Sequence, residues 1–211
     1  MNTEDVVEIE VFYDLVCPFC LIGKTQLDAA LATLGREVRV RWSPYLLDPQ
    51  LPEGGLPFQR YHRMKYGERA RPMQQQVERI GQRLGIPFDF LKLSRYPQTL
   101  DGHRAVRLAA EHGQAGAMVE VLLRAYFLED QDIGRPEVLA ALAESRLGLP
   151  GQAFAQRLAS DWQRDEVRAD QRRSVQLGVR SVPSYRLGGR YIEHTDDLVN
   201  ILSGALPAPT H

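Results

Sequence analysis

The apolar positions near the start of the chain follow a strand pattern and then change to a helical period. Residues 6–13 form an apolar run that is typical of a strand. After it, four apolar residues recur at the i, i+3, i+4 and i+7 positions of one helix face: Leu27, Ala30, Leu31 and Leu34. Residues 38–42 then alternate with a period of two. This order predicts two parallel strands joined by a right-handed crossover.

The middle of the chain shows helical periods without strand-like alternation. A loop rich in proline and glycine begins near residue 46. The helices predicted after it cover residues 72–84, 101–113, 118–127 and 136–148, and Asp101 is expected to cap the second of them. Because each helix buries one apolar stripe, these helices must pack on one another.

The last part of the chain returns to a mixed pattern. A polar helix is predicted over residues 161–177, and a strand is expected to start near Pro183. Gly188-Gly189 is a two-residue hairpin signal, so residues 190–192 should form the returning strand. Thr195 is expected to cap a last helix.

These patterns predict an α/β fold with an all-helical insertion. Residues 1–47 and 156–211 should form one discontinuous α/β domain, and residues 48–155 the inserted helical domain. A chain of 211 residues is long enough to bury such a core without covalent crosslinks.

The two cysteines of the sequence, Cys17 and Cys20, lie where the first strand gives way to the first helix. Cysteine attacks as its thiolate, and the unpaired N–H groups and positive dipole at a helix start stabilise a negative sulfur. Pro18 suits the first helical position, and residues three apart lie close enough for a disulfide after modest adjustment. This spacing is typical of a thioredoxin-like redox site. We expect Cys17 to be the nucleophile near the exposed tip and Cys20 the resolving thiol one turn in.

A metal site is the first alternative for this cysteine pair. Structural zinc usually takes four Cys or His ligands, and the chain has no second Cys-x-x-Cys motif. The five histidines do not provide a pair with zinc-finger spacing: His62, His103, His112, His194 and His211. We therefore expect no metal and no cofactor beyond the redox-active disulfide itself.

Charge and composition exclude several partner classes. The net charge is −1, with 25% charged and 44% hydrophobic residues, so no overall field would attract nucleic acid or an anionic membrane. A basic cluster at Arg168, Arg172 and Arg173 is interleaved with acidic residues and is interpreted as a solvated helix face. No apolar run approaches 18 residues, and the acidic start lacks the pattern of a secretion signal. The expected location is the cytoplasm.

Five segments, in the same order along nearly the whole chain, resemble the DsbA-like thioredoxin-fold oxidoreductases, and most closely their FrnE-like cytoplasmic branch. The first contains Cys17-Pro18-Phe19-Cys20, and the last contains Val182-Pro183. These two are specific, and the other three are supportive. The segments are residues 12–24, 101–104, 124–127, 165–170 and 177–183.

The resemblance implies roles for the residues in those segments. It implies a cis Val182–Pro183 bond that faces the cysteine pair, with neighbouring backbone that pairs with an extended substrate. The sequence by itself favours a trans proline at the start of an edge strand. The Pro18-Phe19 dipeptide would help to set the reduction potential.

Two positions depart from the family pattern. Relatives often carry a buried acid six residues before the first cysteine, where this chain has Val11. The nearest acid is Asp14, which would either share in proton transfer or only cap the catalytic helix. His194 stands in a segment where relatives often have a different turn, and it would either tune a thiolate or lie on the surface.

Three functions are compatible with these features. The leading hypothesis is a thiol–disulfide oxidoreductase or isomerase acting on protein or small-molecule disulfides, with glutathione as a possible co-substrate. A glutathione-dependent isomerase of the kappa or 2-hydroxychromene-2-carboxylate type is the second, although Cys20 argues against it. The third is a chaperone-like binding module whose affinity depends on the disulfide state. The sequence does not determine the oligomeric state.

Overall fold

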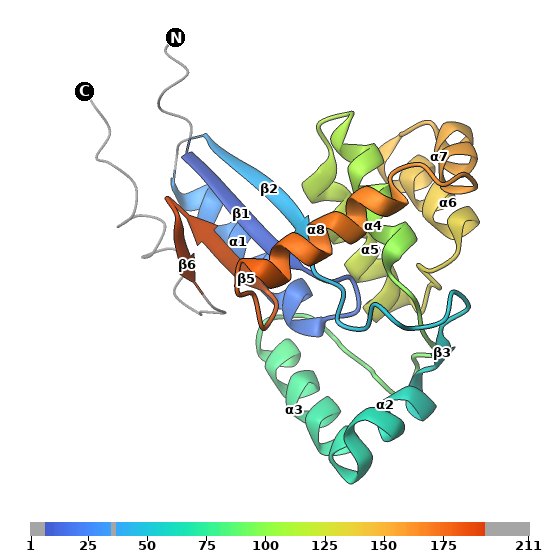
Figure 1. Cartoon of the computed structure of the whole chain (residues 1–211). Coiled ribbons are helices and arrows are strands. Elements are labelled where there is room, and N and C mark those ends of the chain that lie inside the picture. Colours follow the sequence, from blue (N-terminus) through green and yellow to red (C-terminus); the bar gives the residue numbers. More distant parts are fainter. Residues whose placement is uncertain (1–6, 35–36, 193–211) are drawn as a thin grey trace.

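A four-stranded sheet forms the centre of the α/β part of the molecule (Figure 1). The computed structural model describes residues 7–34 and 37–192. Strand β1 (Val7–Tyr13) pairs in parallel with β2 (Val38–Pro44) and antiparallel with β5 (Ser184–Leu187). Strand β6 (Arg190–Ile192) completes the order β2-β1-β5-β6. The predicted parallel pair and the predicted hairpin are both confirmed.

Helices cover both faces of this sheet. Helix α1 (Pro18–Leu34) lies on one face, and α8 (Arg164–Gln176) crosses the other face (Figure 1). Strand β1 is buried from both sides, and its alternate residues Ile9 and Val11 pack with Leu27 of α1 in one apolar cluster. The uninterrupted apolar run Val11–Tyr13 at the end of β1 follows from this double coverage.

The inserted helices form two groups. Helices α4 to α7 pack on one another, while α2 and α3 extend as an arm beside the start of α1 (Figure 1). Their bounds are α2 Phe58–Tyr66, α3 Ala70–Arg83, α4 Leu100–Ala110, α5 Ala115–Glu129, α6 Pro136–Leu147 and α7 Gly151–Leu158. A short antiparallel pair, β3 (Leu56–Pro57) with β4 (Arg95–Tyr96), closes the base of the arm.

The sequence pattern does not predict several of these elements. Helix α2 is mostly polar and buries only Phe58 and Tyr61, and α7 is only eight residues long. Strands β3 and β4 have two residues each, too few to show a period. The expected domain boundary at residue 155 falls inside α7, so the proposed division stays a prediction.

Some predicted boundaries are wrong by a few residues. Helix α4 begins at Leu100 with Thr99 as its cap, so Asp101 does not occupy that position. Asp101 lies in the first turn and instead accepts a hydrogen bond from Arg104, 2.7 Å away. The predicted helix capped by Thr195 lies outside the described residues.

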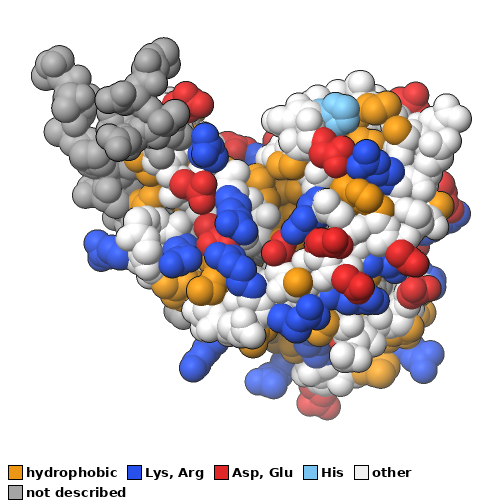
Figure 2. Space-filling model, turned by 45° about the horizontal axis from the view of Figure 1, so that its top comes forward, with side chains coloured by type: hydrophobic (Ala, Val, Ile, Leu, Met, Phe, Trp, Pro, Cys, Tyr) orange, Lys and Arg blue, Asp and Glu red, His pale blue; other side chains and the backbone are white. Residues whose placement is uncertain are grey.

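Charged groups of both signs are interspersed over the face of the molecule shown in Figure 2. Among residues 7–34 and 37–192, no helix is both long enough and apolar enough for a membrane span. The mixture of signs on the face shown in Figure 2 offers no patch of one sign to a polyanion.

One arginine of the predicted solvated face has a structural role, which corrects that interpretation. Arg173 of α8 donates to the buried carboxylate of Glu10 in β1, with Nη2 3.2 Å from Oε2. Ser43 of β2 donates to the same carboxylate over 2.6 Å. Burial by itself would raise the pKa of Glu10, but the hydrogen bonds from Arg173 and Ser43 outweigh it and hold the pKa below 4.5. This contact ties α8 to the sheet.

Replacing Arg173 should therefore weaken the fold in a pH-dependent way. We expect Arg173→Gln to lower the free energy of unfolding by about 1–2 kcal/mol near neutral pH, because a buried carboxylate loses a charged donor. Because the folded-state pKa of Glu10 is depressed, its contribution is present above pH 4.5 and disappears as the pH falls through the lower folded value. The difference in the free energy of unfolding between Arg173→Gln and the wild type should therefore become smaller as the pH falls.

Urea unfolding at about pH 7 and about pH 4 measures this effect. Arg172→Gln is the matched control, because Arg172 is the neighbouring arginine on the same helix and makes no such contact with the sheet among residues 7–34 and 37–192. Equal losses in both variants, or a loss that does not change with pH, would contradict the assigned role of Arg173.

Candidate active site

The two cysteines lie at the turn that leads from β1 into α1. Helix α1 begins at Pro18, so Cys17 directly precedes its first residue and Cys20 lies in its first turn. The turn is closed by the Cys17 N–H, 3.3 Å from the Asp14 carbonyl oxygen, and by the Cys20 N–H, 2.9 Å from the Cys17 carbonyl oxygen. Both thiols are free. The motif therefore occupies the strand–helix junction that its spacing predicts.

Cys17 is less exposed than expected. Only 5% of its surface is accessible, so the prediction of an exposed tip is wrong. Its sulfur donates to the carbonyl oxygen of Val182, 3.3 Å away, and its other side borders a cavity. The Val182–Pro183 peptide bond is cis. The structure thus brings together Cys17, Cys20, Val182 and Pro183, as the sequence resemblance implies.

Gly23 allows α1 to approach the Val182–Pro183 segment closely. A Cβ atom at this position would lie 2.8 Å from Cγ of Pro183 and 2.6 Å from the hydroxyl of Tyr185. Burial raises the pKa of Tyr185, and the charges of Cys20 and then Cys17 add to the shift. Sequence reasoning did not identify Gly23 or Tyr185 as site residues. The signal available was a glycine inside a helix, which costs about 1 kcal/mol relative to alanine and so implies a packing reason.

The environment of Cys20 favours its protonated form. Burial raises its pKa well above the ordinary value of 9.0, and the hydrogen bond and charge of Cys17 raise it further. A backbone hydrogen bond with Asp14 acts in the opposite direction, while the Asp14 carboxylate adds to the rise. Cys20 is therefore held as a neutral thiol, directly beside Cys17.

Asp14 lies beneath the cysteines and is only 1% exposed. Its carboxylate accepts the backbone N–H groups of Leu15 and Leu47, each over 2.8 Å. The third contact is His103 of α4, whose Nε2 lies 3.2 Å from Oδ1. These partners are backbone N–H groups outside α1 and a side chain of α4, and the choice between proton transfer and helix capping for Asp14 stays a prediction.

His103 was not singled out as a site residue, although it stands inside one of the segments that carry the resemblance. It is fully buried, and its ring meets Tyr13 edge-on with centroids 4.9 Å apart. The Nδ1 atom of His103 and the hydroxyl of Tyr13 are buried without a hydrogen-bond partner in the described part of the chain. Burial, with the charges of Asp14 and Cys20, raises the pKa of Tyr13. This polar cluster connects α4 of the insertion to the cysteine turn.

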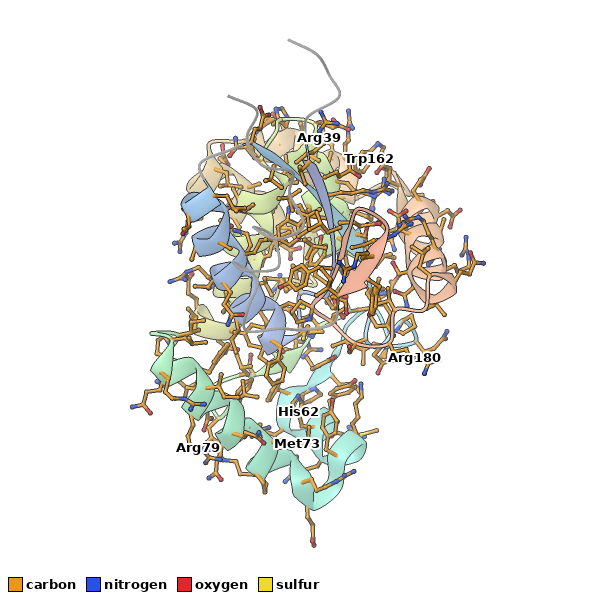
Figure 3. The ribbon with its side chains drawn as sticks, turned by 90° about the vertical axis from the view of Figure 1, so that its left-hand side faces the viewer. Arg39, His62, Met73, Arg79, Trp162 and Arg180 are labelled. Atoms are coloured by element: carbon orange, nitrogen blue, oxygen red, sulfur yellow. The ribbon has the colours of Figure 1, made fainter. Side chains whose placement is uncertain are left out.

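A cavity of about 160 Å³ opens beside Cys17. Pro18 and Phe19 of α1 border it on one side, and the arm formed by α2 and α3 borders it on the other. Figure 3 shows His62 of α2 and Met73 of α3 close together at this place. Most of the remaining wall is apolar and includes Phe58, Val77, Phe90 and Phe127.

Two further expectations concern groups outside this arrangement. His194 lies beyond the described residues, so its role stays a prediction. Within the residues described, the Cys, His, Asp and Glu side chains form no group of three that could hold a metal ion.

Comparisons with known proteins agree with this geometry. The model of the DSBA-like thioredoxin domain matches residues 8–206. The uncharacterised protein YwbO of Bacillus subtilis is 28% identical over 191 residues, which is 88% of this chain and 89% of that protein.

Two solved structures extend the comparison to the fold. A probable DsbA oxidoreductase from Streptomyces coelicolor aligns with a TM-score of 0.83 at 27% identity, covering 94% of this chain and 89% of the other. The cytosolic disulfide reductase DsbM of Pseudomonas aeruginosa aligns with a TM-score of 0.68 at 25% identity, covering 93% and 97%. The family model covers both the α/β part and the helical insertion. This chain belongs to the family of DSBA-like thioredoxin domains, which are disulfide oxidoreductases.

Proposed function

We propose that this protein exchanges thiols and disulfides through Cys17 as nucleophile and Cys20 as resolving thiol. The observation that carries the proposal is the arrangement of the two sulfurs. Cys17 stands at the start of α1 with its sulfur between the Val182 carbonyl and a cavity, and Cys20 is buried beside it. Cys17 is placed to react with a substrate disulfide, and Cys20 is placed to displace the substrate thiol from Cys17.

The proposed reaction proceeds in two displacements. The Cys17 thiolate attacks one sulfur of a substrate disulfide, the other substrate sulfur leaves and takes up a proton, and a mixed disulfide forms. Cys20 then loses its proton and attacks the Cys17 sulfur, which releases the second substrate thiol and leaves a Cys17–Cys20 disulfide. The backbone N–H groups at the start of α1 stabilise the negative charge on Cys17 before attack, and again when a thiol reduces the Cys17–Cys20 disulfide.

Val182 gives the Cys17 thiol a partner that changes with its ionisation. The neutral thiol donates to the Val182 carbonyl oxygen. A thiolate or a disulfide sulfur has no proton to donate, so this carbonyl becomes available as an acceptor. We propose that a backbone N–H of an extended substrate then takes that place beside Pro183.

We propose that the protein acts as a disulfide reductase or isomerase in the cytoplasm, with glutathione or another small thiol returning it to the dithiol form. The similar DsbM protein is described as a cytosolic disulfide reductase. A cytosolic glutathione pool favours reduction of most exchangeable disulfides. Placement in the FrnE-like branch belongs to the same proposal. Glutathione redox buffers would give the reduction potential, and a strongly oxidising value would oppose this direction.

The alternative functions have less support. A solved 2-hydroxychromene-2-carboxylate isomerase is 18% identical, a likeness that shows the fold alone. The contact between Cys17 and Cys20 favours a dithiol reaction over one that needs a single nucleophile. The chaperone-like function stays a prediction. It would require client binding that persists in a Cys17→Ser/Cys20→Ser variant, together with no disulfide turnover in the wild type.

Replacing Cys17 and replacing Cys20 should impair insulin reduction in different ways. Cys17→Ser should abolish reduction of insulin by dithiothreitol above the uncatalysed rate. Cys20→Ser should lose most turnover but accumulate a mixed disulfide, because the resolving thiol is missing. Turbidity follows the reaction, and intact-protein mass spectrometry detects the adduct. Full turnover in Cys20→Ser would favour the single-nucleophile isomerase instead.

Gly23→Ala should disturb the site without removing a reacting group. The added methyl cannot fit beside Pro183 and Tyr185, so α1 must shift away from the Val182–Pro183 segment. We expect kcat/KM for insulin reduction to fall roughly 10-fold or more, since displacements of about 1 Å can cost two orders of magnitude. Gly116→Ala in α5 is the matched control, because its Cβ would come no closer than 3.3 Å to Trp42. Similar activity in both variants would contradict the close-approach argument.

Asp14 is proposed to tune Cys20. Its carboxylate raises the Cys20 pKa, so Asp14→Asn should lower that pKa and let the resolving step proceed at lower pH. Release of the second thiol in single turnovers, followed against pH with circular dichroism to confirm folding, measures this shift. If resolution instead slows at every pH, Asp14 acts as the proton acceptor. An unchanged profile in a folded variant would remove Asp14 from the mechanism.

A further inference from the structure

The cavity beside Cys17 has the size of a single ring. Its volume is about 160 Å³, and apolar cavities of about 150 Å³ in other proteins take up benzene. The wall behind it is closely packed, with Phe58 and Phe90 stacked at 6.0 Å and Phe90 edge-on to Phe127 at 6.1 Å. Because these rings pack closely on one another, they fix the shape of the cavity wall.

The titratable side chains of the cavity wall are neutral near pH 7. Burial, and then the charge of Lys65, lower the pKa of His62 to about 4. Burial, and then the charge of Cys17, raise the pKa of Tyr66. Burial also raises the pKa of Tyr96. Apart from the Cys17 sulfur, the wall therefore presents an uncharged imidazole and uncharged phenols.

The polar side chains near the cavity contact other side chains of the protein. The amide Nε2 of Gln74, which is buried, lies 3.3 Å from Nδ1 of His62. The cations near the cavity have partners of their own: Lys65 donates to the hydroxyl of Tyr61 over 2.7 Å. Arg71 donates to Oε1 of Gln74 over 3.4 Å and to Oε1 of Glu78 over 2.8 Å. Within the described residues, the cavity wall contains no Lys or Arg to pair with a carboxylate and no Asp or Glu to pair with an amine. A charged group placed there would lose its hydration without compensation.

Cys17, the proposed reacting residue, lines the cavity together with the two residues that follow it, Pro18 and Phe19. A group bonded to the sulfur that Cys17 attacks would extend into this space. The Cys17 sulfur also contacts the Val182 carbonyl oxygen, and Val182 is not part of the cavity wall. The cavity is therefore placed to select the substituent on the attacked sulfur.

We propose that this cavity is a specificity pocket for disulfides that carry a small, uncharged, aromatic or branched apolar substituent. The proposal rests on the thiol–disulfide exchange proposed above and adds the substrate class. Met73 of α3 stands at the edge with 44% of its surface exposed, and its flexible thioether suits an adaptable rim (Figure 3).

The reaction balances with the protein dithiol as the reductant. For a substrate R–S–S–R′ with R in the cavity, the Cys17 thiolate bonds to the sulfur that carries R, and R′–S⁻ leaves and takes up a proton. The intermediate is R–S–S–Cys17. Cys20 then loses its proton and attacks Cys17, R–S⁻ leaves and is protonated, and the products are R–SH, R′–SH and the Cys17–Cys20 disulfide. Two electrons pass from the protein to the substrate.

Two chromogenic aromatic disulfides test the pocket in single turnovers of the reduced protein. One is uncharged 4,4′-dithiodipyridine, and the other is 5,5′-dithiobis(2-nitrobenzoate), whose rings carry carboxylates. Each rate is divided by the rate of the same reagent with free cysteine at the same pH. We expect the wild type to favour the uncharged reagent by about 10-fold or more after this correction.

Three variants assign the preference to the cavity. Val77→Phe, which fills the space, should reduce the preference to near unity. Met73→Lys should accelerate the carboxylated reagent, because it adds a cation at the rim. Met64→Lys is the matched control, since Met64 is 68% exposed on α2 and does not border the cavity, and its preference should stay at the wild-type value. Circular dichroism identifies the variants that fold.

The possible failures are distinguishable. If no Cys17-dependent reaction occurs with either reagent, the proposed function fails. If the wild type reacts with both but shows no preference, or if Met64→Lys changes the preference as much as Met73→Lys, the exchange activity stands and the pocket proposal is overturned.

Discussion

The buried carboxylate of Asp14 holds together the segments that meet beneath the cysteines. It accepts N–H groups from the loops after β1 and after β2, and it contacts His103 of α4. A carboxylate with 1% exposure is stable only when its oxygens are satisfied, so these three contacts must form together. They fix the path of the chain from β1 into α1. The position of Cys17 and the start of α1 depend on that path.

The two sulfurs occupy unlike environments even though they are three residues apart. Cys17 precedes the helix, donates to Val182 and borders a cavity, whereas Cys20 is enclosed and is held as a neutral thiol. The two environments differ because the residues that surround Cys17 are not the ones that surround Cys20. The close packing of α1 on Pro183 and Tyr185, which the absence of a side chain at Gly23 permits, maintains it. This arrangement supports the proposal that Cys17 is the nucleophile and Cys20 the resolving thiol.

The helical insertion contributes to the site in two separate ways. Helix α4 supplies His103, which contacts Asp14, while α2 and α3 supply part of the neutral wall beside Cys17. Phe90, Tyr96 and Phe127, from outside those two helices, supply more of that wall. Elsewhere, buried charges are paired, as Glu10 with Arg173 and Arg104 with the carbonyl oxygens of the turn that follows α7. The cavity differs from those places because no Lys, Arg, Asp or Glu of the described residues lines it.

The sequence by itself determined the elements whose signals are local. The strand before Cys17, the crossover to β2, the hairpin at Gly188-Gly189 and the cysteine motif all follow from periods or spacings between residues close together in the chain. The family resemblance added the cis Val182–Pro183 bond. Short or polar elements such as α2, β3 and β4 left no such signal, since their stability comes from packing against distant segments.

Tertiary structure alone decided the partners. Cys17 and Val182 are 165 residues apart, Asp14 and His103 are 89 apart, and Glu10 and Arg173 are 163 apart. No local pattern encodes such pairs, because the free energy that selects them is gained only when the sheet and the inserted helices close on one another. For the same reason the sequence predicted the position of Cys17 at the junction of β1 and α1, but not its 5% exposure or the neutral cavity beside it.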